Sequence, residues 1–88
     1  MAQGKTVVTV NMRRMRTDLE LPTDVPLEVL LPELLNALKN IDPEEFYRST
    51  IIAVTRRGYL LADEKKTLAA YGVRDGEILS IHPVEVYQ

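Results

Sequence analysis

Five arginines lie at two places where the chain breaks its apolar pattern, and they are the side chains best suited to bind a ligand. Three fall in residues 13–16 and two directly precede a glycine: Arg13, Arg14, Arg16, Arg56 and Arg57. A guanidinium group is planar and permanently charged, and it clamps a carboxylate through two parallel hydrogen bonds. The arginines therefore predict a contact with acidic groups on a partner protein. The alternative is that they are solvated residues of exposed turns.

The sequence offers little else that could do chemistry. His82 is the only histidine, and there is no cysteine, so a thiol nucleophile, a disulfide and a zinc thiolate site are excluded. A lone imidazole with no nucleophile or paired carboxylate at motif spacing is a poor catalytic base. We expect His82 to be an outward-facing strand residue, with contact on a binding face as the alternative. The sequence predicts no enzyme, no metal site and no cofactor.

The charge balance argues against nucleic acid as the partner. The 88 residues carry 11 basic and 13 acidic side chains, a formal net charge of −2. Nucleic-acid-binding domains usually show a strong basic excess. The longest apolar-rich run, residues 25–38, contains two glutamates and two prolines and is too short and too charged to span a bilayer. We expect one domain, residues 1–88, in the cytoplasm, without a signal peptide or direct membrane insertion.

Alternating residues predict a hairpin that carries three of the arginines. Residues 6–12 read TVVTVNM, and residues 17–21 read TDLEL. Both runs alternate in the period of a strand with one apolar face, and the first is rich in β-branched residues. Leu19 and Leu21 are expected to point inward. The polar residues 13–16 then form the connecting turn.

Leucines at three- and four-residue spacings predict one amphipathic helix after the hairpin. They are Leu27, Leu30, Leu31, Leu34, Leu35 and Leu38. A proline such as Pro32 is tolerated in the first turn of a helix, where its missing N–H needs no partner. We therefore expect either a regular helix that starts near Glu28 or Val29 or a kink at residues 31–32, with the helix ending at residues 39–41.

The second half of the chain predicts two short helical turns and three more strands. Residues 42–45 read DPEE, a helix-start signature with room for one turn. Residues 67–73 predict another turn, closed by Gly72 in the left-handed region. Pro83 is expected to mark the end of regular pairing in the last strand. The strands are expected over residues 50–55, 59–62 and 78–86.

This order of elements is that of the β-grasp, an α+β fold in which a mixed sheet of about five strands wraps one helix. Residues 67–79 resemble the C-terminal half of ubiquitin-like proteins, with a Thr-Leu pair before an aromatic residue and an aliphatic one. Over nearly its whole length the chain is similar to the YukD/EsaB-like ubiquitin-fold family of type VII secretion, and especially to the ubiquitin-like cytosolic head of EccD-type membrane subunits. The similarity rests on RR at 13–14, DLELP at 18–22, DVP at 24–26 and LLPEL at 30–34.

The resemblance implies a protein-interaction module with an accessory or scaffold role in secretion. Its partner would be the membrane-anchored secretion ATPase, another membrane subunit or a second copy of the chain. The chain would be either a free-standing family member or the cytosolic domain of a longer membrane protein. We also expect the two arginine turns to lie near each other beside the last strand, so that the five arginines and His82 form one protein-binding face.

Conjugation to targets is not expected. Ubiquitin and the sulfur carriers end in Gly-Gly, whereas residues 84–88 read VEVYQ. By the same resemblance, Thr55, Ser80 and His82 match the apolar patch of ubiquitin. All three are polar, so we do not expect ubiquitin receptors to bind this chain.

The alternative to a secretion component is a stand-alone cytosolic adaptor or regulator with a ubiquitin-like fold and no link to secretion.

Overall fold

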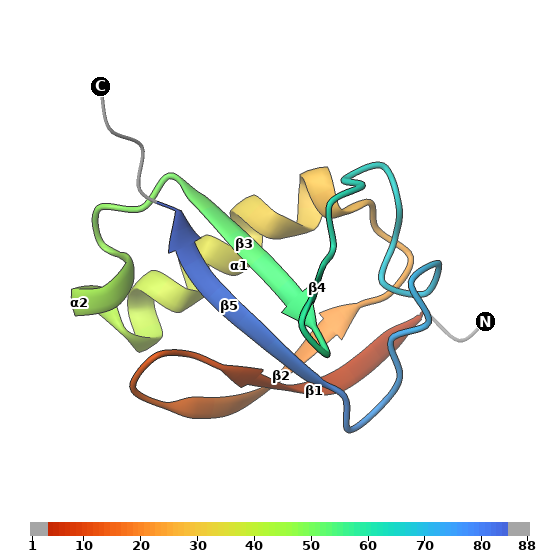
Figure 1. Ribbon diagram of the computed structural model, residues 1–88, viewed down its shortest axis with the longest axis horizontal. Coiled ribbons are helices and arrows are strands. Elements are labelled where there is room, and N and C mark those ends of the chain that lie inside the picture. Colours follow the sequence, from red (N-terminus) through yellow and green to blue (C-terminus); the bar gives the residue numbers. More distant parts are fainter. Residues whose placement is uncertain (1–3, 85–88) are drawn as a thin grey trace.

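The computed structural model describes residues 4–84 and shows one sheet with a long helix across one face (Figure 1). The five strands stand in the order β2-β1-β5-β3-β4. The expected continuation of the last strand to Val86, and the tail at residues 85–88, lie outside the described residues. The elements are β1 (Lys5–Asn11), β2 (Arg16–Pro22), α1 (Leu27–Ile41), α2 (Pro43–Phe46), β3 (Ile51–Arg56), β4 (Tyr59–Leu60) and β5 (Ile78–Val84).

The middle of the sheet is a parallel pair made by β1 and β5. Val10 of β1 lies opposite Leu79 of β5, whereas the β1–β2, β3–β5 and β3–β4 pairs are antiparallel. A mixed sheet of this order with one helix crossing it is a β-grasp, so the predicted fold class is confirmed. β1 is parallel to β5 and β3 is antiparallel to β5, so β1 and β3 run in opposite directions.

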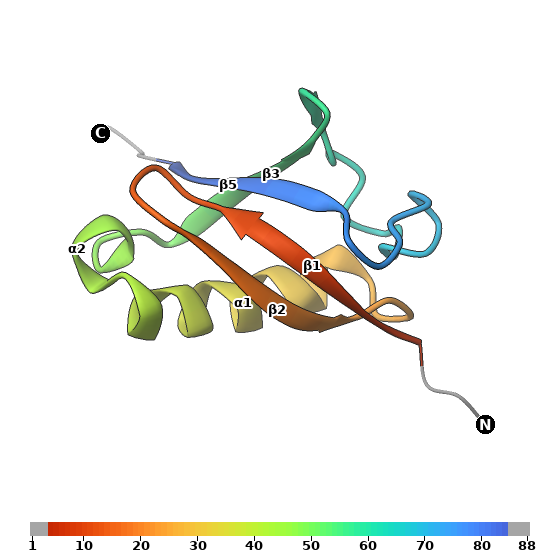
Figure 2. The same cartoon turned by 90° about the horizontal axis from the view of Figure 1, so that it is seen from below.

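The leucine stripe of α1 packs onto one face of the sheet, and Figure 2 shows the helix lying across that face. Leu34, in the middle of the stripe, is 4% exposed, and Leu38 is completely buried. The strand residues of this core are Val8, Val10, Leu21, Ile52, Val54, Leu79 and Ile81. The alternation seen in the sequence therefore identifies the core side of β1 and β2 correctly. No helix within residues 4–84 has the length and apolarity needed to cross a membrane.

The start of α1 differs from the prediction. The helix begins at Leu27, so Pro32 is its sixth residue and lies beyond the first turn. Pro32 cannot donate to the carbonyl of Glu28 four residues earlier. Both residues are exposed, so this carbonyl is not sealed in the core. A neighbouring loop sets the early start, because Leu27 N donates to Lys66 O at 3.0 Å and Glu28 N donates to Glu64 O at 2.9 Å.

Both short helical turns form as predicted. The carboxylate of Asp42 accepts a hydrogen bond from the N–H of Glu45 at 3.3 Å and thereby caps α2. Gly72 adopts a φ of +79°. Val73 N donates to Leu68 O at 3.0 Å, which is the closing bond of a Schellman motif. Leu68 and Val73 are both buried, so this turn closes one end of the core.

Regular pairing in β5 extends past Pro83, contrary to the prediction. Pro83 lies opposite Ile52, and the β3–β5 ladder continues to Val84. In an antiparallel ladder, alternate residues turn their backbone groups away from the partner strand. Pro83 occupies such a position, and its missing N–H faces the β1 side, where pairing has already stopped at Ser80. The proline therefore costs this ladder no hydrogen bond.

Candidate protein-binding surfaces

The β1–β2 hairpin presents its three arginines at its tip. The turn is closed by Met12 N, which donates to Met15 O at 2.8 Å. Arg13, Arg14 and Arg16 are all exposed. Three cations are thus held on a hydrogen-bonded turn that projects beyond the sheet.

One of these arginines is already paired within the chain. Arg14 Nη1 lies 2.7 Å from Glu44 Oε2, and both side chains are more than half exposed. The hydrogen bond to Glu44 raises the pKa of Arg14 above its ordinary value. The ion pair links the hairpin tip to α2, so the acidic turn lies beside the arginines. Toward residues 4–84, Arg13 makes no side-chain hydrogen bond and Arg16 uses only Nε, which donates to Asn11 Oδ1 at 3.2 Å. These two cations of the tip therefore retain most of their donors for a partner.

The expectation that all five arginines form one patch is wrong. β1 and β3 run in opposite directions, and each arginine turn lies at the C-terminal end of its strand. The hairpin tip therefore extends toward the C-terminal end of β5, whereas the turn at Arg57 and Gly58 lies by Ile78 at the other end (Figure 1). The chain presents two separate basic turns.

Arg56 stabilises the fold and has few donors left for a partner. Its Nη1 donates to Tyr71 O at 2.5 Å and its Nη2 to Gly72 O at 3.3 Å. Its Nε and Nη2 also donate to Glu77 Oε1, at 3.0 and 2.6 Å. The hydrogen bond from Arg56 is the main cause of the lowered pKa of Glu77. The neighbouring Arg57 is exposed, with a φ of +53° in the tight β3–β4 turn.

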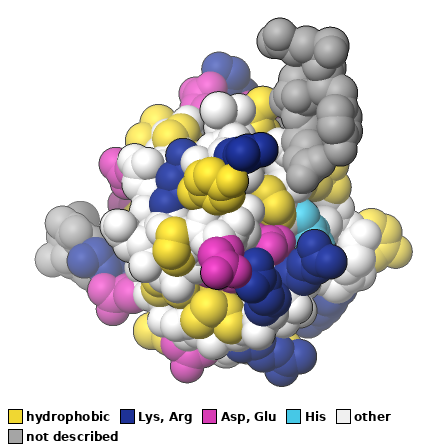
Figure 3. All heavy atoms as spheres, turned by 90° about the vertical axis from the view of Figure 1, so that its left-hand side faces the viewer, with side chains coloured by type: hydrophobic (Ala, Val, Ile, Leu, Met, Phe, Trp, Pro, Cys, Tyr) yellow, Lys and Arg dark blue, Asp and Glu magenta, His cyan; other side chains and the backbone are white. Residues whose placement is uncertain are grey.

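His82 lies on the open face of the sheet, on the side of the hairpin tip. It is exposed and stands opposite Ala53, two residues beyond the last β1–β5 pair, Asn11 with Ser80. The predicted outward orientation is therefore confirmed. Figure 3 looks onto this end of the molecule and shows the histidine beside basic side chains.

Two residues after α2 extend this end of the molecule. Tyr47 is 59% exposed. Arg48 Cζ lies 5.2 Å from the centre of the Tyr47 ring, which is within cation–π distance. Arg48 follows a helix of only four residues. No periodic signal in the sequence could have marked it. We name the whole set the hairpin-end surface: Arg13, Arg14, Arg16, Tyr47, Arg48 and His82.

The centre of the open sheet face is polar. Thr55 lies directly opposite Ser80, and both are partly exposed. Exposed apolar residues occupy the margins of this face instead, including Val7 and Ile78. Within residues 4–84, no cluster of three or more His, Cys, Asp or Glu side chains could hold a metal ion.

The sequence matches a known family over most of its length. Residues 6–81 match the family described as "WXG100 protein secretion system (Wss), protein YukD". No curated protein matches the chain.

Solved structures share the fold. The ubiquitin-like domain of the Mycobacterium tuberculosis type VII secretion system protein ECCD1 is 26% identical, with a TM-score of 0.75 over 93% of this chain and 99% of that domain. The EccD5 ubiquitin-like domain from Mycobacterium xenopi is 18% identical, with a TM-score of 0.79 over 94% and 98%. A chain of the MycP5-free ESX-5 inner membrane complex is 21% identical, with a TM-score of 0.74 over 96% of this chain and 22% of the longer one. With its ubiquitin-like fold and its match over residues 6–81, this chain belongs to the YukD family of the WXG100, or type VII, protein secretion system.

Proposed function

We propose that this domain is a non-catalytic docking module of a type VII secretion apparatus, bound to its partner through the hairpin-end surface and not conjugated to targets. The family match over residues 6–81 carries the assignment to secretion. We assign partner binding to the hairpin-end surface because its arginines are exposed cations on a projecting turn, and most of their donors make no hydrogen bond to the described residues.

The partner is an acidic surface on the cytosolic side of the secretion machinery, either the secretion ATPase or another membrane subunit. A domain of the same fold forms part of a longer chain in the ESX-5 inner membrane complex, which supports a position next to membrane subunits. Guanidinium groups favour planar carboxylates, which they bind through two hydrogen bonds. Tyr47, stacked under Arg48, adds an aromatic contact of the kind enriched in interfaces.

A second copy of the chain is the other candidate partner. Glu44 lies beside the hairpin-end surface, paired with Arg14, so two copies could exchange Arg14–Glu44 contacts across an interface. Sedimentation velocity of the purified protein at several concentrations separates this case from the first. A monomer at all concentrations favours a different partner protein.

The identity of the partner is tested by crosslinking in the native cell followed by affinity capture and mass spectrometry. A crosslinker that joins lysines or carboxylates is added before lysis, and the chain is captured under denaturing conditions. We expect crosslinks to a subunit of the secretion apparatus. Crosslinks only to proteins with no link to secretion would favour the alternative, a stand-alone cytosolic adaptor with this fold.

A further inference from the structure

The outer edge of β3 is open over the N-terminal part of the strand. β4 has two residues and pairs only with Thr55 and Arg56. Leu61 N adds one more bond, to Val54 O at 2.9 Å. Because backbone groups alternate along a strand, the N–H and C=O of Ile52 point to the same outer side as the Val54 carbonyl. Within the described residues, no strand pairs with this part of the edge.

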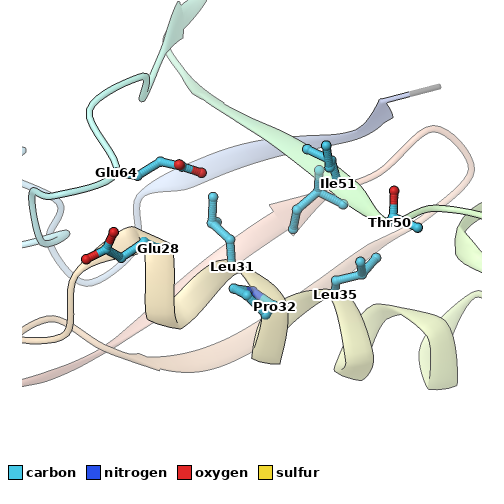
Figure 4. Close-up of a pocket in the computed structure, with 8 residues that line it drawn as sticks. Glu28, Leu31, Pro32, Leu35, Thr50, Ile51 and Glu64 are labelled. Atoms are coloured by element: carbon cyan, nitrogen blue, oxygen red, sulfur yellow. The ribbon is translucent and has the colours of Figure 1, made fainter. Parts of the chain in front are cut away.

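An apolar groove lies next to this edge, between β3 and α1. Figure 4 shows Leu31 and Leu35 on the helix side and Ile51 on the strand side. Ile51 is 52% exposed. The groove has a volume of about 190 Å³. That is below the usual size of a small-molecule pocket and suits one or two side chains.

The charged residues that line the groove are both acidic and lie at one end of it. Glu28 and Glu64 stand together at the end far from Thr50 (Figure 4). Glu28 is already paired, because Lys65 Nζ lies 2.9 Å from its Oε2, and this contact raises the pKa of Lys65. The Glu64 side chain is exposed and makes no ion pair with the described residues. This end of the groove therefore favours a cation.

We propose that this β3-edge groove binds an extended peptide segment of a partner protein as an added antiparallel strand. Unpaired backbone groups of the edge call for a strand, since a helix has no backbone groups to offer them. Apolar side chains at alternate positions of the segment fill the groove over Leu31 and Leu35. In the antiparallel direction the N-terminal end of the segment meets Glu64, so a lysine or arginine leads it. The open edge spans about four residues, roughly 13 Å.

This surface is distinct from the hairpin-end surface and does not depend on it. The partner is a flexible segment with a basic residue followed by alternating apolar residues, a pattern opposite in charge to the acidic partner of the arginines.

The test uses the isotope-labelled protein and an acetylated, amidated probe peptide, Lys-Thr-Val-Thr-Val, followed by NMR. We expect amide shifts confined to residues 50–54 and to the adjoining side of α1. Hydrogen exchange of the Ile52 amide should slow at least ten-fold at saturating peptide. Two further probes carry N-methyl groups on both threonines or on both valines. Because only alternate N–H groups face β3, one of the two should lose binding more than ten-fold and the other should retain it.

Charge variants test the acidic end. Glu64→Lys should weaken binding of the lysine-led peptide about two- to five-fold, the range for an exposed ion pair. Glu33→Lys makes the same charge change on the exposed face of α1, outside the groove, and should leave binding within two-fold. The proposal is overturned if no probe binds at millimolar concentration, if both methylated probes bind like the parent, or if shifts map to β2. A dimer that forms through the β3 edge would overturn it as well, because a second copy would then be the occupant.

Discussion

Arg56 and Glu77, which are 21 residues apart, meet in an ion pair of 2.6 Å at the end of β3. The side chains are 22% and 13% exposed, so solvent reaches the pair only in part. The same guanidinium holds the carbonyls of Tyr71 and Gly72. One arginine thereby fastens the Gly72 turn and the start of β5 to the β3–β4 hairpin.

Replacing Arg56 should therefore destabilise the domain. Arg56→Ala leaves two backbone carbonyls and a carboxylate without their donor, and we expect a loss of about 1–3 kcal/mol in the free energy of unfolding. Arg57→Ala, one residue away and exposed, should change it by less than about 0.5 kcal/mol. Urea denaturation of both variants measures the difference. Equal stabilities would mean that the contacts of Arg56 contribute nothing net.

The free energy of unfolding should fall in acid because two carboxylates next to the start of β5, Glu77 and Asp75, must then be protonated. The pKa of Glu77 is lowered by its hydrogen bond from Arg56, and the pKa of Asp75 is lowered by hydrogen bonds from Thr6 Oγ1 at 2.5 Å and Val7 N at 2.9 Å. A lowered pKa means that the unfolded chain binds the proton more tightly. The stabilisation is therefore complete above the ordinary pKa values of 4.5 and 3.8 and is lost as the pH falls through the lower folded values.

The acid prediction is measured by urea midpoints between pH 6 and pH 2.5. Glu77→Gln and Asp75→Asn should each flatten the decline of the midpoint in acid. Glu33→Gln, an exposed change on α1, serves as the control and should retain the wild-type slope. An unchanged slope in the Glu77 and Asp75 variants would assign the acid sensitivity to other carboxylates.

The packing of α1 predicts a steep contrast between two of its apolar residues. Leu34 is 4% exposed and Val29 is 50% exposed. Leu34→Ala should cost about 2–5 kcal/mol, because it leaves a cavity against the sheet. Val29→Ala should cost less than about 0.5 kcal/mol. Thermal or urea unfolding of the two variants measures this difference. A loss below about 0.5 kcal/mol for Leu34→Ala would contradict the packing of Leu34 in the core.

Pro32 offers a stabilising change. Alanine at this position restores the N–H that the carbonyl of Glu28 lacks and removes the clash of the ring, at the loss of the restriction that proline places on the unfolded chain. We expect Pro32→Ala to raise the free energy of unfolding by about 1–2 kcal/mol. A decrease would show that the ring makes packing contacts worth more than the restored hydrogen bond.

The elements of the fold are local features, and the sequence predicts them well. Alternation in β1 and the leucine spacing in α1 each report which side of an element is buried. Gly72 could be placed in the left-handed region because a helical turn needs such a residue at its end. The start of α1, and therefore the place of Pro32 within the helix, differs from the prediction. It depends on the carbonyls of residues 64 and 66, which lie far away in sequence.

The site was predicted less well, and the reason is the direction of the strands. Arg14 and Arg56 look equivalent in sequence, since each accompanies another arginine at a hairpin turn. Because β1 and β3 are antiparallel to each other, the two turns lie at opposite ends of the sheet. The partners of Arg56, at residues 71, 72 and 77, are fixed by the tertiary fold, so no local pattern could separate a structural arginine from an exposed one.

The most direct test of the docking role is charge reversal at the hairpin tip in the native cell. Arg13→Glu with Arg16→Glu is compared with Arg57→Glu and Arg74→Glu, two exposed arginines away from the hairpin tip, so both variants change the net charge equally. With both variants folded, we expect the hairpin variant alone to lose capture of the secretion subunit and secretion of WXG100 proteins, with a binding loss that shrinks at high salt. Wild-type capture and secretion by the hairpin variant would contradict the account and leave these arginines as solvated turn residues.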